Sequence, residues 1–375
     1  MPKREPSRRP VIGWDVGGAH LKACRLSDGA VQEVVQWICP LWQGLSHLEA
    51  ALAQADARWP DAAQADHAVT MTGEMTDLFA DRADGVQRIA ALLDARWPGR
   101  VRLYAGPGRW VGPDEAVAAW PDIASANWRA TAQLAAQRLG RGLLVDIGST
   151  TTDLIAFDQG RLLGDALSDR DRLASGELVY HGVVRTPLCA LAPRIAFQGQ
   201  PLNVMNEFFA TTADVYRLTG ELDADHDLYP PADGGAKTRE ATQARLARMV
   251  GCDRRDGSDA DWLAFAHTWR SAQLDRIAGE VRRVLGLRGL SLEGATVVAA
   301  GAGAFLLPDL LERMQRPSPG IVSGDVRLCD FGAGVAPVRE GETYDACLRG
   351  ARLCAPSVAV AALAAQAQGA RPVDR

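Results

Sequence analysis

Lysine is almost absent from this chain of 375 residues: only Lys3, Lys22 and Lys237 occur among 41 basic residues. Arginine supplies nearly every other positive charge. Because a compact ammonium and a planar guanidinium bind phosphate oxygens differently, lysines kept in this background are candidates for functional positions, with chance retention as the alternative. Lys3 falls in a basic N-terminal tail, which leaves Lys22 and Lys237 as candidates for contacts with an anionic ligand.

Several other features are missing. The seven cysteines are scattered without a C-x-x-C pair, which argues against zinc and favours reduced thiols in the cytoplasm. No apolar run approaches the ~18 residues of a membrane-spanning helix, and the basic tail is not followed by the apolar core of a signal peptide. A net charge of −5 gives no reason to expect nucleic acid or a membrane as partner. We therefore expect a cytoplasmic protein with small-molecule ligands.

The stretch that organises the chain is residues 143–157, LLVDIGSTTTDLIAF. An apolar run ends at Asp146, a glycine permits a tight turn, hydroxyl side chains follow, and a second apolar run begins. The spacing predicts a β-hairpin whose turn presents N–H groups and hydroxyls to an anion such as phosphate. A carboxylate beside the turn would repel phosphate, so the motif also predicts a cation, Mg²⁺, between the carboxylate and the phosphate. The turn residues of this motif are Gly148, Ser149, Thr150 and Thr151.

Two further glycine motifs accompany it. Residues 11–26 repeat the pattern with Asp15, Gly17, Gly18 and Lys22, and residues 296–307 run from an apolar strand into Gly301 and Gly303. One such turn is weak evidence, since most are structural. Three in this order resemble the two phosphate loops and the adenosine-side loop of the actin, sugar kinase and Hsp70 superfamily.

This resemblance implies an α/β protein of the actin-like ATPase class, with two ribonuclease H-like domains that flank a cleft and helical insertions in the second domain. We expect a disordered tail over residues 1–10, a first domain over 11–140, a second over 141–342 with an insertion at about 165–290, and C-terminal helices over 343–375. The apolar spacing also predicts helices over 122–139 and 203–222, the latter with Phe208 in the core, and a strand pair over 175–187.

Polar residues elsewhere add candidates for the site. Glu74 follows a β-rich run at the point where a helix should begin, which is where ligands bind in open α/β sheets; Asp77 nearby is better explained as a helix cap. Asn127 is a costly residue for a plain helix. The remaining candidates, from a charge run, an alternating segment and a long polar loop, are Asp171, Glu177, Tyr180, Arg185 and Lys237.

Eight segments together resemble a narrower family, in order and over nearly the whole chain: DVGGAHLK, MTGEMTDLF, SANW, LLVDIGSTTTDL, DRLASGELVYHGVVRTP, EFFATTADVYRLTGEL, ADGGAKT and VVAAGAG. They are similar to the tetrahydromethanopterin-linked one-carbon pathway proteins, which are related to the hydantoinase and oxoprolinase A subunits. Archaeal members of that family are methanofuran-biosynthesis synthases. The resemblance implies a transferase that joins an aminomethylfuran-methyl diphosphate to the phenol oxygen of a (glutamyl)tyramine or tyrosine-type acceptor and releases diphosphate.

Under this hypothesis Asp15 and Asp146 hold Mg²⁺, and the three glycine motifs contact diphosphate through Gly17, Gly18, Lys22, Gly148, Ser149, Thr150, Thr151, Gly301 and Gly303. Glu74, Glu177 and Asp171 are unranked candidates for the general base, and Asn127, Tyr180, Arg185 and Lys237 are candidates for substrate binding. Two alternatives stay open: an ATP-dependent kinase or oxoprolinase-like amidohydrolase, and a non-catalytic nucleotide-sensing protein. A homodimer is also left open.

Overall fold

The predicted N-terminal hairpin opens a six-stranded sheet in the computed structural model, which describes residues 9–315 and 326–370. The sheet comprises β1 (Val11–Val16), β2 (His20–Ser27), β3 (Ala30–Ile38), β4 (Asp66–Met71), β5 (Val101–Tyr104) and β6 (Trp110–Val111), in the order β3-β2-β1-β4-β5-β6. Strands β1 to β3 form an antiparallel meander, and β4 and β5 continue parallel to β1. This order and these directions are those of a ribonuclease H-like fold.

Two compact units make up the chain. The first contains residues 1–142, 157–171 and 329–375, and the second contains residues 143–156 and 172–328. The predicted disordered tail, residues 1–10, lies outside the described residues except for its last two. The predicted C-terminal helices over 343–375 belong to the first unit rather than standing apart.

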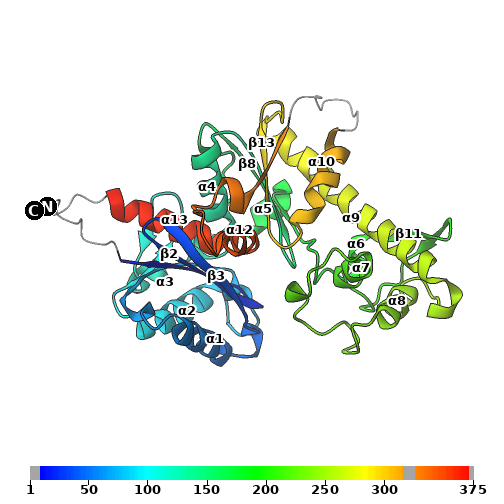
Figure 1. Ribbon diagram of the computed structural model, residues 1–375, viewed down its shortest axis with the longest axis horizontal. Coiled ribbons are helices and arrows are strands. Elements are labelled where there is room, and N and C mark those ends of the chain that lie inside the picture. Colours follow the sequence, from blue (N-terminus) through cyan, green and yellow to red (C-terminus); the bar gives the residue numbers. More distant parts are fainter. Residues whose placement is uncertain (1–8, 316–325, 371–375) are drawn as a thin grey trace, which may run out of the picture. The chain divides into compact units, whose positions relative to one another are not determined.

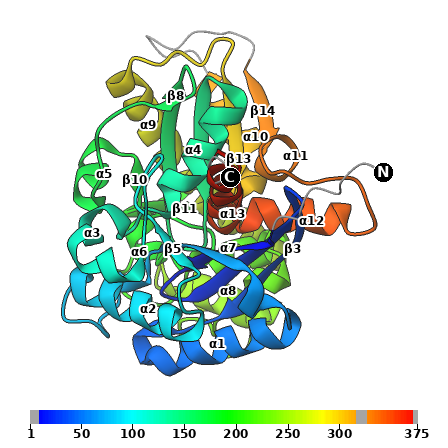
Figure 2. The ribbon, with the colours of Figure 1, turned by 90° about the vertical axis from the view of Figure 1, so that its left-hand side faces the viewer.

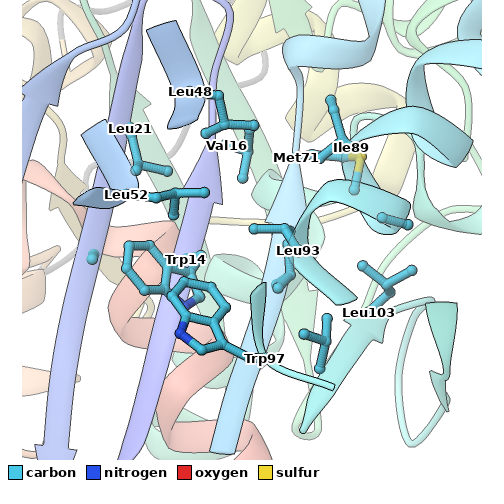
Figure 3. Packing of buried hydrophobic residues seen from close by; sticks show 14 of the residues in the cluster. Trp14, Val16, Leu21, Leu48, Leu52, Met71, Ile89, Leu93, Trp97 and Leu103 are labelled. Carbon is cyan, nitrogen blue, oxygen red and sulfur yellow. The ribbon is translucent and has the colours of Figure 1, made fainter. Parts of the chain in front are cut away.

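One face of the first sheet is covered by α1 (Leu45–Arg58) and α2 (Arg82–Arg96) (Figures 1 and 2). Alternate side chains of β1 point to this face, as strand geometry requires, and place Ile12, Trp14 and Val16 in the core. Trp14 stacks on Trp97 with ring centroids 5.1 Å apart, among the leucines of α1 and α2 (Figure 3). The two indole rings belong to the hydrophobic core of this unit.

The opposite face of the sheet carries α13 (Ala355–Ala370), while α12 (Tyr344–Leu353) packs against β3. Helix α13 approaches β1 so closely that a Cβ on Gly13 would overlap the carbonyl oxygen of Ser357 and the side chain of Ala361. No single helix among the described residues is long and apolar enough to cross a membrane; α12 and α13 together reach that length and composition, but they are bent by 103°.

The second unit is built on the central hairpin of β7 (Gly142–Ile147) and β8 (Thr152–Asp158), as predicted. The sheet that contains this hairpin has the order β10-β8-β7-β13-β14, with β10 (Leu178–Val179), β13 (Thr296–Ala300) and β14 (Arg327–Asp330). Strand β9 (Arg161–Leu162), which belongs to the first unit, pairs with the end of β8. A separate two-stranded sheet joins β11 (Arg194–Phe197) and β12 (Gln200–Asn203). The remaining helices of the chain are α3 (Ala116–Ile123), α4 (Asn127–Leu139), α5 (Asp169–Ser175), α6 (Leu188–Leu191), α7 (Thr212–Thr219), α8 (Arg239–Arg248), α9 (Asp259–Arg288), α10 (Leu307–Gln315) and α11 (Phe331–Gly334).

Several predicted elements were wrong in extent. The helix expected over 122–139 is two helices, broken at Ser125, whose φ of 52° lies in the left-handed region that ends a right-handed helix. The helix expected over 203–222 is reduced to α7, and Phe208 is 56% exposed rather than in the core. Only β10 remains of the strand pair expected over 175–187, because the chain bends at Gly182 to pack on the β7–β8 turn.

The predicted helix cap was also misplaced. A short 3₁₀ turn, η3 (Gly73–Met75), follows β4, and α2 begins only at Arg82. The N-cap is Asp81, whose carboxylate accepts the backbone N–H of Asp84 at 2.9 Å, whereas Asp77 lies exposed before it. The capping chemistry was right, but the residue was wrong by four positions.

We expect Gly13→Ala to destabilise the first unit by about 1–3 kcal/mol, because the added methyl group must push α13 away from β1. Gly341→Ala is the matched control: it lies in the same unit, and a Cβ there would meet no atom within 4 Å. Urea unfolding followed by tryptophan fluorescence measures both variants. Equal stability of the two variants would show that α13 does not depend on this close approach.

Candidate active site

The turn between β7 and β8 carries a row of backbone N–H groups and hydroxyl side chains. It is closed by the backbone N–H of Gly148, which donates to the carbonyl of Thr151 at 2.8 Å. Among the described residues, the N–H groups of Ser149, Thr150 and Thr151 have no protein acceptor, and the hydroxyls of Ser149 and Thr150 lie 3.4 Å apart. Successive unpaired N–H groups in a turn form a concavity that binds phosphate-like anions.

A neighbouring segment around Gly182 braces this turn. The N–H of Val183 donates to the Gly148 carbonyl at 3.0 Å, and those of Val184 and Arg185 donate to the Ser149 carbonyl at 3.0 and 2.9 Å. A Cβ on Gly182 would overlap the backbone between Ser149 and Thr150. The alternating pattern predicts a strand here and gives Gly182 no role; the glycine inside an otherwise apolar segment was the available signal.

The third glycine motif packs against the same hairpin, at Asp146. Gly301 has a φ of 81°, and a Cβ there would overlap a carboxylate oxygen of Asp146 and the carbonyl of Ile147. The N–H of Gly303 donates to the Ile147 carbonyl at 2.7 Å. The structure thus brings together two of the three predicted glycine motifs within the second unit, and their close approach requires residues without side chains.

In the first unit, Asp15 lies one residue before the end of β1, and its carboxylate is buried. The ammonium of Lys22 lies 3.5 Å from Oδ2, the side chain of Asn127 hydrogen-bonds to the carboxylate, and Oδ1 has no partner among the described residues. Burial raises the pKa of Asp15, and Lys22 and Asn127 oppose that rise. Asn127, predicted from its unusual place in a helix to bind substrate, therefore lies at the carboxylate of the first hairpin.

Glu74 forms a second buried carboxylate in the same unit. The hydroxyl of Ser125 donates to its Oε1 at 3.0 Å, and the guanidinium of Arg82 lies 3.6 Å from that oxygen. Arg82 also donates to the Ser125 hydroxyl oxygen at 2.7 Å and pairs with Asp169 at 3.2 Å. Sequence patterns indicated Glu74 but not its partners. Ser125 is 51 residues away in the chain, and Arg82, although close in sequence, belongs to a different element, at the start of α2.

The other predicted residues have diverse surroundings. Glu177 is bound by Arg288 at 2.9 Å and by Ser175 at 2.8 Å, and Asp171 accepts from Ser168 at the start of α5. Lys237 pairs with Asp227 at 3.1 Å. The Arg185 guanidinium lies 6.0 Å from the ring centroid of Tyr229, and Tyr180 is 58% exposed.

Within residues 9–315 and 326–370, no group of three or more His, Cys, Asp or Glu side chains could hold a metal ion.

The strand order and the phosphate-type turn define an α/β protein of the actin-like ATPase class with two ribonuclease H-like units. The hydantoinase/oxoprolinase family matches residues 66–342, about three quarters of the chain, and the chain belongs to this family. The family relationship inferred from the eight sequence motifs is therefore confirmed.

Two curated relatives and a solved structure are similar to the chain. The (4-{4-[2-(gamma-L-glutamylamino)ethyl]phenoxymethyl}furan-2-yl)methanamine synthase of Methanocaldococcus jannaschii is 29% identical over 304 residues, which are 80% of this chain and 88% of the relative. The synthase of the same name from Methanococcus vannielii is 30% identical over 175 residues, 46% of this chain and 76% of the relative. A ROK family glucokinase from Streptomyces griseus, solved with glucose and AMPPNP, aligns with 94% of this chain and 98% of its own at 12% identity and a TM-score of 0.47.

We expect Gly182→Ala to weaken the binding of inorganic diphosphate at least about tenfold, because its methyl group displaces the backbone that presents the N–H groups of Ser149 and Thr150. Isothermal titration with diphosphate and Mg²⁺ measures the affinity. Gly279→Ala, on the exposed side of α9 where a Cβ meets no atom within 4 Å, is the control and should bind as the wild type does. Unchanged affinity in Gly182→Ala would place the anion elsewhere.

We expect Asp15→Asn to stabilise the ligand-free protein at pH 8. A carboxyl group whose folded pKa is raised favours folding fully only below its unfolded pKa of about 4, and this contribution is lost as pH rises through the folded pKa. The amide removes the cost of burying the charge, so its advantage over the wild type should grow between pH 4 and pH 8. Melting temperatures across this range test it, with exposed Asp77→Asn as control. A difference that does not vary with pH would contradict the raised pKa.

Proposed function

We propose that the protein is a transferase of methanofuran-type cofactor biosynthesis. It would join an aminomethylfuran-methyl diphosphate to the phenol oxygen of a (glutamyl)tyramine or tyrosine-type acceptor and release diphosphate. The observation that carries the proposal is the 29% identity with the Methanocaldococcus jannaschii synthase, which extends over 88% of that relative. The unpaired N–H groups of the β7–β8 turn support it, since they suit an anionic leaving group.

In the proposed reaction, the main task of the enzyme is to stabilise the negative charge that develops on the leaving diphosphate. Cleavage of a furfuryl carbon–oxygen bond develops positive charge on carbon and negative charge on diphosphate, so donors that are fixed before the reaction lower the barrier most. In the second unit these donors are the N–H groups of Ser149, Thr150 and Thr151 and the hydroxyls beside them. Arg185, whose backbone is bonded to Ser149, is proposed to hold the diphosphate or the acceptor carboxylate.

The residues present also suit Mg²⁺, which prefers oxygen ligands. Asp15 has a buried carboxylate oxygen without a partner among the described residues, and Asp146 lies where its own phosphate-type turn begins. Each is proposed as a Mg²⁺ ligand, in the first and second unit respectively. When bound, the ion would neutralise negative charge on the leaving diphosphate.

We expect Asp146→Asn to lose at least about 100-fold in the rate of diphosphate release, because the amide removes a metal-binding charge beside the turn. Diphosphate release from the furan diphosphate and tyramine, γ-glutamyltyramine or tyrosine measures the rate and identifies the acceptor. Asp165→Asn, at an exposed position, is the control and should keep wild-type activity. Normal turnover in Asp146→Asn, with an unchanged melting temperature, would contradict the role of this carboxylate.

A ligand panel separates this proposal from the alternatives. Diphosphate, ATP and ADP, each with Mg²⁺, are compared for the rise in melting temperature that a ligand of the folded state produces. Stabilisation by diphosphate and not by ATP is the expected result. Strong stabilisation by ATP, with substrate-dependent hydrolysis, would support a kinase or an oxoprolinase-like amidohydrolase. Binding of nucleotide without turnover of any substrate would support the sensing protein.

A further inference from the structure

Glu74 has an unusual combination of burial and incomplete hydrogen bonding. It lies in η3, directly after β4, and its side chain is fully buried. Ser125 donates to Oε1, but Oε2 is buried without a partner among the described residues. A buried carboxylate oxygen without a donor is costly, so a donor from outside the chain is the simplest reason for its retention.

The other two candidates for the general base are already engaged. Both Glu177 oxygens have partners, because Arg288 binds one and the Ser175 hydroxyl donates to the other. Asp171 is exposed and accepts the Ser168 hydroxyl at 2.7 Å, as a residue at a helix start does. Of the three carboxylates, only Glu74 keeps a buried oxygen for a ligand.

Backbone conformation singles out the same place. Ser125 has a φ of 52°, which residues other than glycine adopt only where their surroundings enforce it. In that conformation its hydroxyl both accepts from Arg82 and donates to Glu74. Ser125, in this strained conformation, therefore orients Glu74 and Arg82 toward each other. Met75, the residue after Glu74, is 49% exposed, so the protein surface lies close to this carboxylate.

We propose, taking the transfer described above as the reaction, that Glu74 accepts the proton of the acceptor's phenol hydroxyl and that Arg82 and Asp169 position and tune it. The phenol oxygen forms a bond to the furfuryl carbon as the bond from that carbon to diphosphate breaks, and diphosphate leaves with the electron pair. The phenol proton moves to the Glu74 carboxylate and passes to water after the product departs. No oxidant or reductant is required.

Arg82 and Asp169 act on Glu74 in opposite directions. The Arg82 guanidinium favours the carboxylate form, while Asp169 neutralises Arg82 and repels the Glu74 charge. Burial raises the pKa of Glu74 most; its own N–H, Ser125 and Arg82 oppose this rise, and Asp169 reinforces it. Opposite effects from two neighbouring residues provide a test that a purely structural role does not satisfy.

The experiment measures the rate of diphosphate release from pH 4.5 to pH 9 for four variants. Glu74→Gln should lose at least about 100-fold on the plateau above the acidic limb, where the wild-type carboxylate is ionised. Arg82→Gln should move the acidic limb of the kcat profile to higher pH by roughly one pH unit, and Asp169→Asn should move it to lower pH. Arg88→Gln, on the same helix but paired with Asp84, is the control and should keep the wild-type profile.

The outcomes separate this inference from the proposed function. If the wild type releases no diphosphate with any phenolic acceptor, the proposed function fails. If the wild type is active and Glu74→Gln keeps its rate, or if Arg82→Gln and Asp169→Asn move the limb in the same direction or not at all, the assignment of Glu74 fails alone. A uniform loss of rate without a displaced limb in both tuning variants would mean that the cluster only stabilises the fold.

Discussion

The first unit depends on keeping two carboxylates out of water at the ends of adjacent parallel strands. Asp15 lies one residue before the end of β1, and Glu74 lies shortly after β4. Removing each charge from water costs several kcal/mol, which one nearby cation offsets only in part. Side chains alternate between the two faces of β1, so the strand that presents Asp15 to one face buries the apolar Trp14 on the other. Burial of Trp14 offsets part of the cost of burying Asp15. Burial of the stacked Trp14 and Trp97 rings therefore contributes favourable free energy of folding, which offsets part of the cost of burying the carboxylates.

The second unit solves a different problem, which is to leave backbone donors unpaired while the chain around them stays ordered. Glycines make this possible. Gly182 lets one segment lie against the β7–β8 turn, and Gly301 lets another lie against Asp146 and Ile147. Each segment takes the carbonyl groups of the hairpin as acceptors and leaves the N–H groups of Ser149 and Thr150 unused. The carbonyls of Gly148 and Ser149 accept hydrogen bonds, whereas the N–H groups of Ser149 and Thr150 have no acceptor in the described part of the chain, an arrangement that suits an anion.

Sequence patterns predicted the two hairpins and the third glycine motif, because these elements follow from local hydrophobic spacing and turn chemistry. They also indicated the family. They did not predict the break at Ser125 or the bend at Gly182, since both conformations are imposed by residues distant in the chain: Glu74 and Arg82 in one case and the β7–β8 turn in the other. Phe208 was misplaced because amphipathic spacing does not reveal where a helix starts. The sequence thus indicated Asp15 together with Lys22 and Asn127, which lie at its carboxylate. It did not indicate Gly182, or the partners of Glu74, which are Ser125 and Arg82.

The scarcity of lysine has a structural counterpart in how this protein uses positive charge. Arg245 is fully buried and binds Asp214, Asp233, the Ala236 carbonyl and the Thr242 hydroxyl at once, thereby holding one side of the polar loop before α8. A planar guanidinium can satisfy several acceptors in fixed directions, and an ammonium cannot. Lys22 and Lys237 are each paired with one carboxylate, Asp15 and Asp227 respectively. Arginine builds the networks of this fold, whereas Lys22 and Lys237 each lie beside a carboxylate. At Lys22 that carboxylate belongs to Asp15, whose Oδ1 has no hydrogen-bond partner among the described residues.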